Sequence, residues 1–276
     1  MTDLYAVIGN PIEHSKSPQI HAAFARQTGQ DIRYERILGD LEEFEADVEE
    51  FIADGGRGLN VTVPFKERAF RLADALSERA QDAGAVNTLM MRDDGLYGDN
   101  TDGVGLVRDL GCNHLFDFSG ARILLLGAGG AVRGVLRPLL DAKPGRLVVA
   151  NRTAAKALAL ASAAVKHGAV IGCGLDELAG ERFDLIINGT AAGLAAKVPD
   201  IPADCLAAGG WTYDMLYGNE PTAFVKWGRS HGAARSLDGL GMLVEQAAEA
   251  FRLWRGVQPD TAAVIESLRN PHNPLS

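Results

Sequence analysis

One segment, RILLLGAGGAVRG at residues 122–134, limits the possible fold more than any other. Its Ile and Leu residues follow one another without alternation, which is typical of a parallel strand covered on both faces. Gly127, Gly129 and Gly130 come next, ahead of a helical pattern. Glycines between a buried strand and a helix let the backbone approach a pyrophosphate, whose charge is then held by free N–H groups of the helix. The segment therefore predicts a Rossmann-like, dinucleotide-binding unit.

The residues after the next strand indicate which dinucleotide binds. In NAD-binding loops of this type an acidic residue there bonds the ribose 2′-hydroxyl, whereas LVVA is followed here by Asn151, Arg152 and Thr153. Arg152 would attract a 2′-phosphate, and Lys156 could add a second charge. We therefore predict NADP. Two alternatives stay open at this point: a plain strand-to-helix turn, because the sixth fingerprint position is Val132, and a solvated surface arginine.

Strand and helix patterns alternate along the rest of the chain, which predicts an α/β protein. Strand patterns occupy 4–9, 32–38, 58–63, 147–149, 183–188 and 211–215, the last of which we take to end the second sheet. Helical patterns follow Ser17 and Thr153 and occupy 41–54, 240–255 and 261–268. We expect the final helices to return to the first domain. The predicted domains are 1–102 plus 240–276, an α/β substrate domain, and 103–239, the Rossmann-like NADP domain.

Composition excludes several classes of protein. A formal charge of −9 and the lack of Lys/Arg runs argue against nucleic acid as a partner. No apolar stretch is long enough to span a membrane, and the N-terminus lacks the pattern of a signal peptide, so we expect a cytoplasmic protein without a membrane partner. The three cysteines and six histidines show no disulfide framework and no metal-ligand spacing, so no metal is predicted.

A hydroxyl-rich loop, HSKSP at residues 14–18, follows the first strand and opens a helix. Ser15 and Ser17 supply hydroxyl donors and the helix start supplies N–H groups, so the loop could bind a carboxylate. The alternative is that Ser17 only caps the helix before Pro18 and that Ser15 has no role.

Further motifs stand in a fixed order beside these: NVTVPFK at 60–66, GAVNT at 84–88, GDNTDG at 98–103 and DGLGMLVEQA at 238–247. Together with the glycine loop and the Asn-Arg-Thr segment they closely resemble the shikimate dehydrogenase family, NADP-dependent enzymes of aromatic amino-acid biosynthesis. The resemblance runs from Tyr5 to beyond Gln246. It implies reversible reduction of 3-dehydroshikimate to shikimate, with an N-terminal substrate domain and a C-terminal NADP domain.

The resemblance also implies roles for single residues. Lys66 and Asp102 look like the catalytic pair: hydride delivery to a ketone leaves an alkoxide that must be protonated, and we expect Lys66 to donate that proton and to accept it in the reverse direction. Asp102 would orient the lysine and the substrate hydroxyl, although the sequence leaves open which of the two transfers the proton. The implied substrate-binding residues are Ser15, Ser17, Thr62, Lys66, Asn87, Asp102, Tyr217 and Gln246. The implied cofactor-binding residues are Glu78, Gly127, Ala128, Gly129, Gly130, Ala131, Asn151, Arg152, Thr153, Lys156, Thr190, Met215 and Gly239.

One departure and several alternatives remain. Ala191, Ala192 and Gly193 follow Thr190, where the family often has serines, so a polar cofactor contact is in doubt. A quinate/shikimate dehydrogenase paralogue often prefers NAD through an acidic residue, against which Arg152 argues. A methylenetetrahydrofolate-type dehydrogenase would lack the HSKSP and DNTDG combination, and a non-catalytic NADP sensor would have little reason to keep both Lys66 and Asp102. The sequence leaves a monomer and a homodimer equally open.

Overall fold

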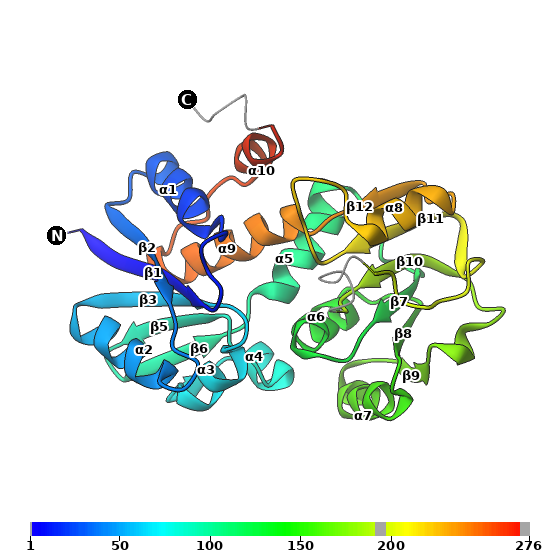
Figure 1. The fold of residues 1–276 in the computed structure, drawn as a ribbon, viewed down its shortest axis with the longest axis horizontal. Helices are drawn as coiled ribbons and strands as arrows, with labels where there is room; N and C mark the ends of the chain where they lie inside the picture. The colour runs from blue at the N-terminus through cyan, green and yellow to red at the C-terminus, as the bar shows by residue number, and fades with distance from the viewer. Residues whose placement is uncertain (1, 191–196, 271–276) are drawn as a thin grey trace. The chain divides into compact units, whose positions relative to one another are not determined.

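The computed structural model describes residues 2–190 and 197–270. The chain divides into two compact units, Met1–Gly105 with Leu243–Ser276, and Leu106–Met242 (Figure 1). It leaves the first unit within helix α5 (Asp102–Arg108) and returns within α9 (Leu240–Arg255). Each unit carries its own six-stranded sheet.

The sheet of the first unit is mixed and has the order β2-β1-β3-β5-β6-β4. Its strands are β1 (Asp3–Gly9), β2 (Ile32–Leu38), β3 (Gly56–Val61), β4 (Ala75–Leu76), β5 (Thr88–Arg92) and β6 (Gly95–Asp99). The helices of this unit besides parts of α5 and α9 are α1 (Ser17–Thr28), α2 (Phe44–Ala53), α3 (Lys66–Leu72), α4 (Glu78–Ala83) and α10 (Ala262–Arg269). Strand β5 pairs antiparallel with both β3 and β6, so β3 and β6 run in the same direction and end at the same edge of the sheet.

The sheet of the second unit is parallel throughout, with the order β12-β11-β10-β7-β8-β9. Its strands are β7 (Arg122–Leu126), β8 (Arg146–Asn151), β9 (Val170–Gly174), β10 (Phe183–Asn188), β11 (Leu206–Asp214) and β12 (Arg235–Leu237). The α-helices are α6 (Gly130–Asp141), α7 (Ala154–Ala164) and α8 (Ala223–Ser230), and there are a short π-helix η1 (Asp109–Asn113) and the 3₁₀ helices η2 (Val165–His167) and η3 (Asp176–Leu178). Ile123 and Leu125 enter one apolar cluster while Leu124 and Leu126 enter another, which confirms that both faces of β7 are covered.

The return of the final helices to the first unit is confirmed. The indole of Trp254 in α9 donates to the carbonyl of Leu89 in β5 over 3.0 Å, and Arg255 donates to Gln30 over 2.8 Å. These bonds fix the end of α9 against the N-terminal sheet. Phe251 and Trp254 of α9 also pack against Phe24 and Tyr5, so the apolar pattern of 240–255 has its partner in the first unit.

Two expectations about elements were wrong. Residues 211–215 do not end the second sheet, because α8 and then β12 follow; β12 has three residues, too few to show a strand pattern. The helix expected over 41–54 begins at Phe44, since the carboxylate of Asp40 accepts from the N–H groups of Glu42 and Glu43 and holds them in a turn.

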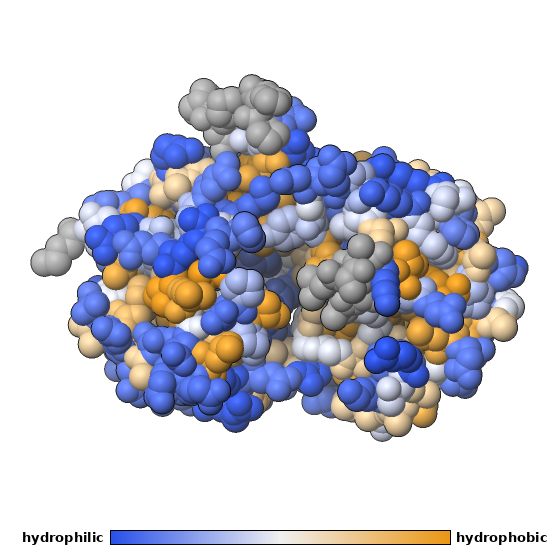
Figure 2. Space-filling model, in the orientation of Figure 1, coloured by the Kyte–Doolittle hydropathy of each residue, from blue (hydrophilic) through white to orange (hydrophobic). Residues whose placement is uncertain are grey.

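Hydrophilic residues cover most of the face drawn in Figure 2, and hydrophobic areas lie between them. The large apolar side chains that are exposed, such as Leu38, Val63 and Leu115, are scattered along the sequence. Among the helices of the described residues, none has the length and apolar character needed to cross a membrane.

Candidate functional site

Two charged side chains meet where β3 and β6 end. Lys66 is the first residue of α3, soon after β3, and Asp102 is the first residue of α5, soon after β6. The Lys66 Nζ lies 2.5 Å from Asp102 Oδ2, and the side chains are 22% and 11% exposed. Partial exposure leaves the ammonium open to a ligand, while the charge-assisted hydrogen bond fixes its position.

Asn87 joins this pair to further predicted residues. Its Nδ2 donates to Asp102 Oδ1 over 2.8 Å and to Gln246 Oε1, from α9, over 3.3 Å. Thr101 also bonds this amide. Its N–H donates to Asn87 Oδ1, and its hydroxyl lies within hydrogen-bond distance of both Nδ2 and Oδ1. The structure thus brings Lys66, Asn87, Asp102 and Gln246 together. Thr101 was missed as a site residue, although the GDNTDG motif contains it.

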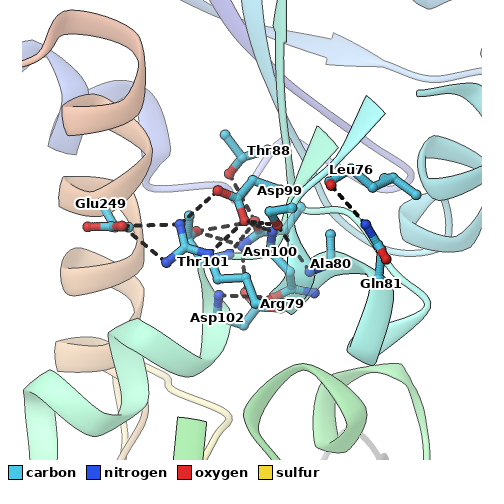
Figure 3. Close-up of polar contacts among 12 residues, drawn as sticks. Leu76, Arg79, Ala80, Gln81, Thr88, Asp99, Asn100, Thr101, Asp102 and Glu249 are labelled. Carbon is cyan, nitrogen blue, oxygen red and sulfur yellow. Dashed lines mark hydrogen bonds and ion pairs between the residues drawn. The ribbon is translucent and has the colours of Figure 1, made fainter. Parts of the chain in front are cut away.

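A buried ion pair lies at the start of the same loop (Figure 3). Arg79 of α4 donates to both carboxylate oxygens of Asp99 over 2.6 and 2.8 Å, and also to Glu249 of α9 over 3.1 Å. Asp99 is 3% exposed and accepts from the hydroxyl of Ser77 as well. Burial alone would lower the pKa of Arg79, but its two carboxylate partners raise it. This cluster anchors the loop that carries Asp102.

The serine loop departs from the sequence expectation. The residue that precedes α1 is Lys16, so Ser17 is the first residue of the helix and its hydroxyl does not cap it. Ser15 Oγ accepts from the N–H of Ser17 over 3.3 Å, and the carbonyl of Ser15 accepts from the guanidinium of Arg36. The interpretation of Ser17 as a simple N-cap is therefore wrong. Loop 14–17 is held by hydrogen bonds at its backbone.

Thr62 is half-buried and follows β3 directly. Its N–H donates to the carbonyl of Ile8 over 3.0 Å, and its methyl group fills the space beside Gly9, where an added Cβ would lie 2.3 Å from it. The close approach requires glycine at position 9. It holds Thr62 against the end of β1, next to the start of the serine loop.

The glycine loop of the second unit has two kinds of glycine. Gly127 has φ +110, which L-residues with a side chain rarely adopt, so the turn itself requires it. Gly129 and Gly130 have no such φ; an added Cβ would meet nothing at Gly129 and only the Arg133 guanidinium, at 3.7 Å, at Gly130. The geometry of the turn therefore does not require glycine at positions 129 and 130. They leave the backbone at the start of α6 open to a ligand. Ala128 is half-buried and Ala131 is exposed.

Val132, the departure from the fingerprint, is buried against the turn. An added Cβ at Gly189 would lie 2.6 Å from Val132 Cγ2. The valine thus uses space that Gly189 provides, so its side chain fits beneath the loop without displacing it.

Basic residues follow the strand next to the glycine loop. Ala150 of β8 pairs with Leu126 of β7, and the side chain of Asn151 donates to the carbonyl of Thr153 over 3.0 Å. Arg152, Thr153 and Lys156 are exposed. Within residues 2–190 and 197–270, neither Arg152 nor Lys156 forms an ion pair with a carboxylate. Both cations are available to an anion.

Thr190, Met215 and Gly239 lie around a buried pair that the sequence did not reveal, Asn188 and Asp214. Thr190 donates its hydroxyl to Asn188 Oδ1 over 2.7 Å, and the N–H of Met215 donates to the carbonyl of Asn188 over 2.9 Å. Asn188 Nδ2 donates to Asp214, whose pKa is raised by burial. An added Cβ at Gly239 would lie 2.3 Å from the carbonyl of Met215. The structure therefore brings the three predicted residues together.

Three predictions remain apart from these groups. Tyr217 belongs to the second unit and is half-buried, which raises its pKa. Glu78 is an exposed residue of the first unit, at the start of α4. The alanines and glycine that follow Thr190 lie outside the described residues.

Comparisons with known proteins follow the same division of the chain. Residues 7–89 match the family described as the shikimate dehydrogenase substrate binding domain, residues 110–196 match the shikimate/quinate 5-dehydrogenase family, and residues 239–269 match the shikimate 5′-dehydrogenase C-terminal domain. The shikimate dehydrogenase (NADP(+)) of Alkalilimnicola ehrlichii is 59% identical over 98% of this chain and 99% of its own length.

Solved structures agree over nearly the whole chain. An Ael1 enzyme from Pseudomonas putida has a TM-score of 0.92 at 49% identity, covering 98% of this chain and 100% of that one. Shikimate 5-dehydrogenase from Thermus thermophilus, solved with NADP(H) and shikimate, has a TM-score of 0.85 at 33% identity, covering 97% and 98%.

An α/β unit with a lysine–aspartate pair, followed by a parallel dinucleotide-binding sheet, defines a dehydrogenase of two units. With the matches above, the chain belongs to the shikimate dehydrogenase family. The family and fold predicted from the motifs are confirmed. Curated relatives named for NADP do not favour the NAD-preferring paralogue or the non-catalytic sensor.

Proposed function

We propose that this chain catalyses the reversible, NADP-dependent interconversion of shikimate and 3-dehydroshikimate in aromatic amino-acid biosynthesis, with Lys66 and Asp102 as its catalytic pair. The observation that supports this most is the 2.5 Å contact between Lys66 Nζ and Asp102 Oδ2 at the common edge of β3 and β6. A positioned, partly exposed ammonium is the proton donor that reduction of a ketone requires.

The residues of the second unit fit NADP. The open backbone at Gly129 and Gly130 would receive the pyrophosphate, and Arg152 with Lys156 would hold the 2′-phosphate. When bound, NADPH supplies the hydride. The other cofactor contacts that we propose are Glu78, Gly127, Ala128, Ala131, Asn151, Thr153, Thr190, Met215 and Gly239.

We assign a substrate-binding role to each residue from the functional group that its side chain carries. The hydroxyls of Ser15 and Ser17 would hold the carboxylate of shikimate. The ring hydroxyls would be held by Thr62, Lys66, Asn87, Asp102 and Gln246, and we propose Tyr217 as a further substrate-binding residue. Four of these residues already form one hydrogen-bonded group through Asn87, so their donors are oriented before a ligand binds.

The proton moves at Lys66 Nζ. In reduction, Nζ donates to the oxygen that becomes the hydroxyl; in oxidation, it accepts from that hydroxyl. Asp102 accepts a hydrogen bond from Nζ and another from Asn87, which leaves its carboxylate oriented toward both groups. Its role is to position the lysine and the reacting hydroxyl.

The test is the absorbance of NADPH formed from shikimate plus NADP, repeated with quinate and with NAD. We expect turnover with shikimate and NADP, and loss of activity in both Lys66→Ala and Asp102→Asn. The matched controls are Lys226→Ala, at an exposed position, and Asp184→Asn, a half-buried carboxylate of the second unit. Absence of turnover with shikimate would refute the proposed function. Retained activity in Lys66→Ala with loss in Asp102→Asn would reverse the two roles.

The remaining expectations concern context. A cytoplasmic location and a monomeric or homodimeric state stay predictions. Gel filtration coupled to light scattering would distinguish the two oligomeric states.

A further inference from the structure

The orientation of the Asn87 side-chain amide determines whether its nitrogen or its oxygen faces the Asp102 carboxylate. With Nδ2 toward Asp102 Oδ1, at 2.8 Å, the carboxylate accepts a hydrogen bond. With the amide turned over, an oxygen would face the carboxylate oxygen and the two acceptors would repel each other. Thr101 Oγ1 lies 2.9 Å from Nδ2 and 3.2 Å from Oδ1, so this hydroxyl accommodates both orientations. The groups that donate to Oδ1 therefore select the orientation: the N–H of Thr101 and the hydroxyl of Thr88, each over 2.9 Å.

That selection begins at Asn60, which lies opposite Thr88 in the β3–β5 ladder. Asn60 Nδ2 lies 3.4 Å from the carbonyl oxygen of Asn87 and 3.3 Å from Thr88 Oγ1. A carbonyl only accepts, so the amide nitrogen of Asn60 must be on this side and its oxygen on the other. Asn60 is 6% exposed and Thr88 is 1% exposed, which keeps competing water away.

Two aromatic side chains reinforce the orientation of Asn60. The Tyr34 hydroxyl donates to Asn60 Oδ1 over 2.7 Å, and burial holds the pKa of this hydroxyl well above its usual value, so it keeps its proton. His21 Nε2 lies 3.1 Å from the same oxygen, and burial lowers the pKa of His21 to about 3. The neutral ring has a single N–H, which must be on Nε2 because Oδ1 accepts. Both donors keep the oxygen of Asn60 turned away from Thr88.

The Thr88 hydroxyl links the orientation of the Asn60 amide to that of the Asn87 amide. Its Oγ1 accepts from Asn60 Nδ2, so its single hydroxyl proton is free to donate to Asn87 Oδ1, 2.9 Å away. The N–H of Thr101 donates to the same oxygen over 2.9 Å. Asn87 Oδ1 is thereby fixed on the side of Thr88, and Nδ2 on the side of Asp102. Figure 3 shows Thr88 beside the segment that runs from Asp99 to Asp102.

We propose that Thr88 is a positioning residue for the reaction: its buried hydroxyl, oriented by Asn60, acts with the N–H of Thr101 to fix the Asn87 amide, so that Asp102 accepts from this amide while bonding Lys66. The inference rests on the proposed function.

The test compares Thr88→Val, which keeps the shape but removes the hydroxyl, with Thr88→Ser, which keeps the hydroxyl. For Thr88→Val we expect kcat to fall on the order of tenfold, the loss of one buried hydrogen bond, with little change in the KM for shikimate. The shape of the kcat profile against pH should change as well, because the hydroxyl acts on the hydrogen bonds of the catalytic pair, whereas partial unfolding would scale kcat equally at every pH. Thr88→Ser should restore both.

The matched control is Thr212→Val: Thr212 is 0% exposed, and among the described residues its side chain bonds one group, the hydroxyl of Ser236 on the neighbouring strand. It should lower the melting temperature and leave kcat and its pH profile unchanged. If Thr88→Val does not fold, Thr88→Ala makes the same comparison with Thr88→Ser.

Three results would overturn the inference while the proposed function stands: an active Thr88→Val with an unchanged pH profile, a loss that Thr88→Ser does not restore, or a loss that follows the fraction of unfolded protein alone. Absence of shikimate turnover in the wild type would instead refute the proposed function.

Discussion

Replacing Arg79 by methionine tests how far burial determines the strength of an ion pair in this protein. Methionine keeps an unbranched apolar side chain in place of the arginine stem and removes the guanidinium. The Asp99 and Glu249 carboxylates, 4% and 3% exposed, would lose their shared cation. Removing one partner of a buried pair leaves a desolvated charge without compensation, which costs roughly 3–5 kcal/mol.

The structure places the expected cost at the lower end of this range. Asp99 keeps hydrogen bonds from the Ser77 hydroxyl and the Asn100 N–H, and Glu249 keeps its ion pair with Arg252 at 2.8 Å. Arg79 itself is 23% exposed, so water can reach part of the vacated space. We therefore expect Arg79→Met to lower the free energy of unfolding by about 3 kcal/mol.

The assay is urea unfolding followed by tryptophan fluorescence. Trp254 belongs to the first unit, whereas Trp211 and Trp227 belong to the second, so replacing the other unit's tryptophans by phenylalanine lets each unit report separately. The control is Arg122→Met. Arg122 bonds both oxygens of Asp184 over 3.0 and 2.8 Å, much as Arg79 bonds Asp99, but its side chain is 44% exposed.

The control should leave the unfolding of its unit essentially unchanged, because water and ions screen an exposed pair. The reasoning would be refuted if Arg79→Met cost less than about 1 kcal/mol, the value expected of a surface pair, or if both variants lost the same stability.

Further predictions concern the loop, the buried histidine and the cofactor. Gly189→Ala should destabilise the second unit by about 1–3 kcal/mol through overpacking against Val132, and Val132→Ala should restore part of it; a double variant no more stable in thermal unfolding would contradict this packing. Burial lowers the pKa of His21 to about 3, so below its unfolded value of about 6.5 the unfolded chain binds a proton that the folded chain does not. Stability should therefore fall as pH falls from about 6.5 toward 3, less steeply in His21→Gln, and parallel urea titrations at several pH values would show whether the slopes differ. Arg152→Asp should raise the KM for NADP at least about tenfold while sparing NAD, and an unchanged preference in initial-rate assays would mean that Arg152 does not bind the phosphate.

The dinucleotide loop could be predicted from the sequence because its determinants are local. A buried parallel strand needs apolar side chains at successive positions, and Leu124 and Leu125 indeed enter clusters on opposite faces. The turn needs glycine at position 127 for its positive φ. Constraints of this kind act within a few consecutive residues, so the local sequence is enough to predict them.

The buried hydrogen bonds behind Asn87 could not be predicted in the same way. His21, Tyr34, Asn60 and Thr88 come from α1, β2, β3 and β5, and they meet only because β5 returns antiparallel beside β3. Each of them taken alone is an ordinary polar residue. The order of strands, which decides their proximity, is not encoded near any of them.

The position of Asn87 has a consequence for the connections between the units. Asp102 lies just before the chain leaves the first unit after Gly105, and Gln246 lies just after it returns at Leu243. The amide of Asn87 bonds both side chains, over 2.8 and 3.3 Å. One buried amide, just before the central strand β5, therefore bonds the ends of both crossing segments within the first unit. Within residues 2–190 and 197–270, the Lys66 ammonium bonds this group through the Asp102 carboxylate, so Asp102 links Lys66 to both crossing segments.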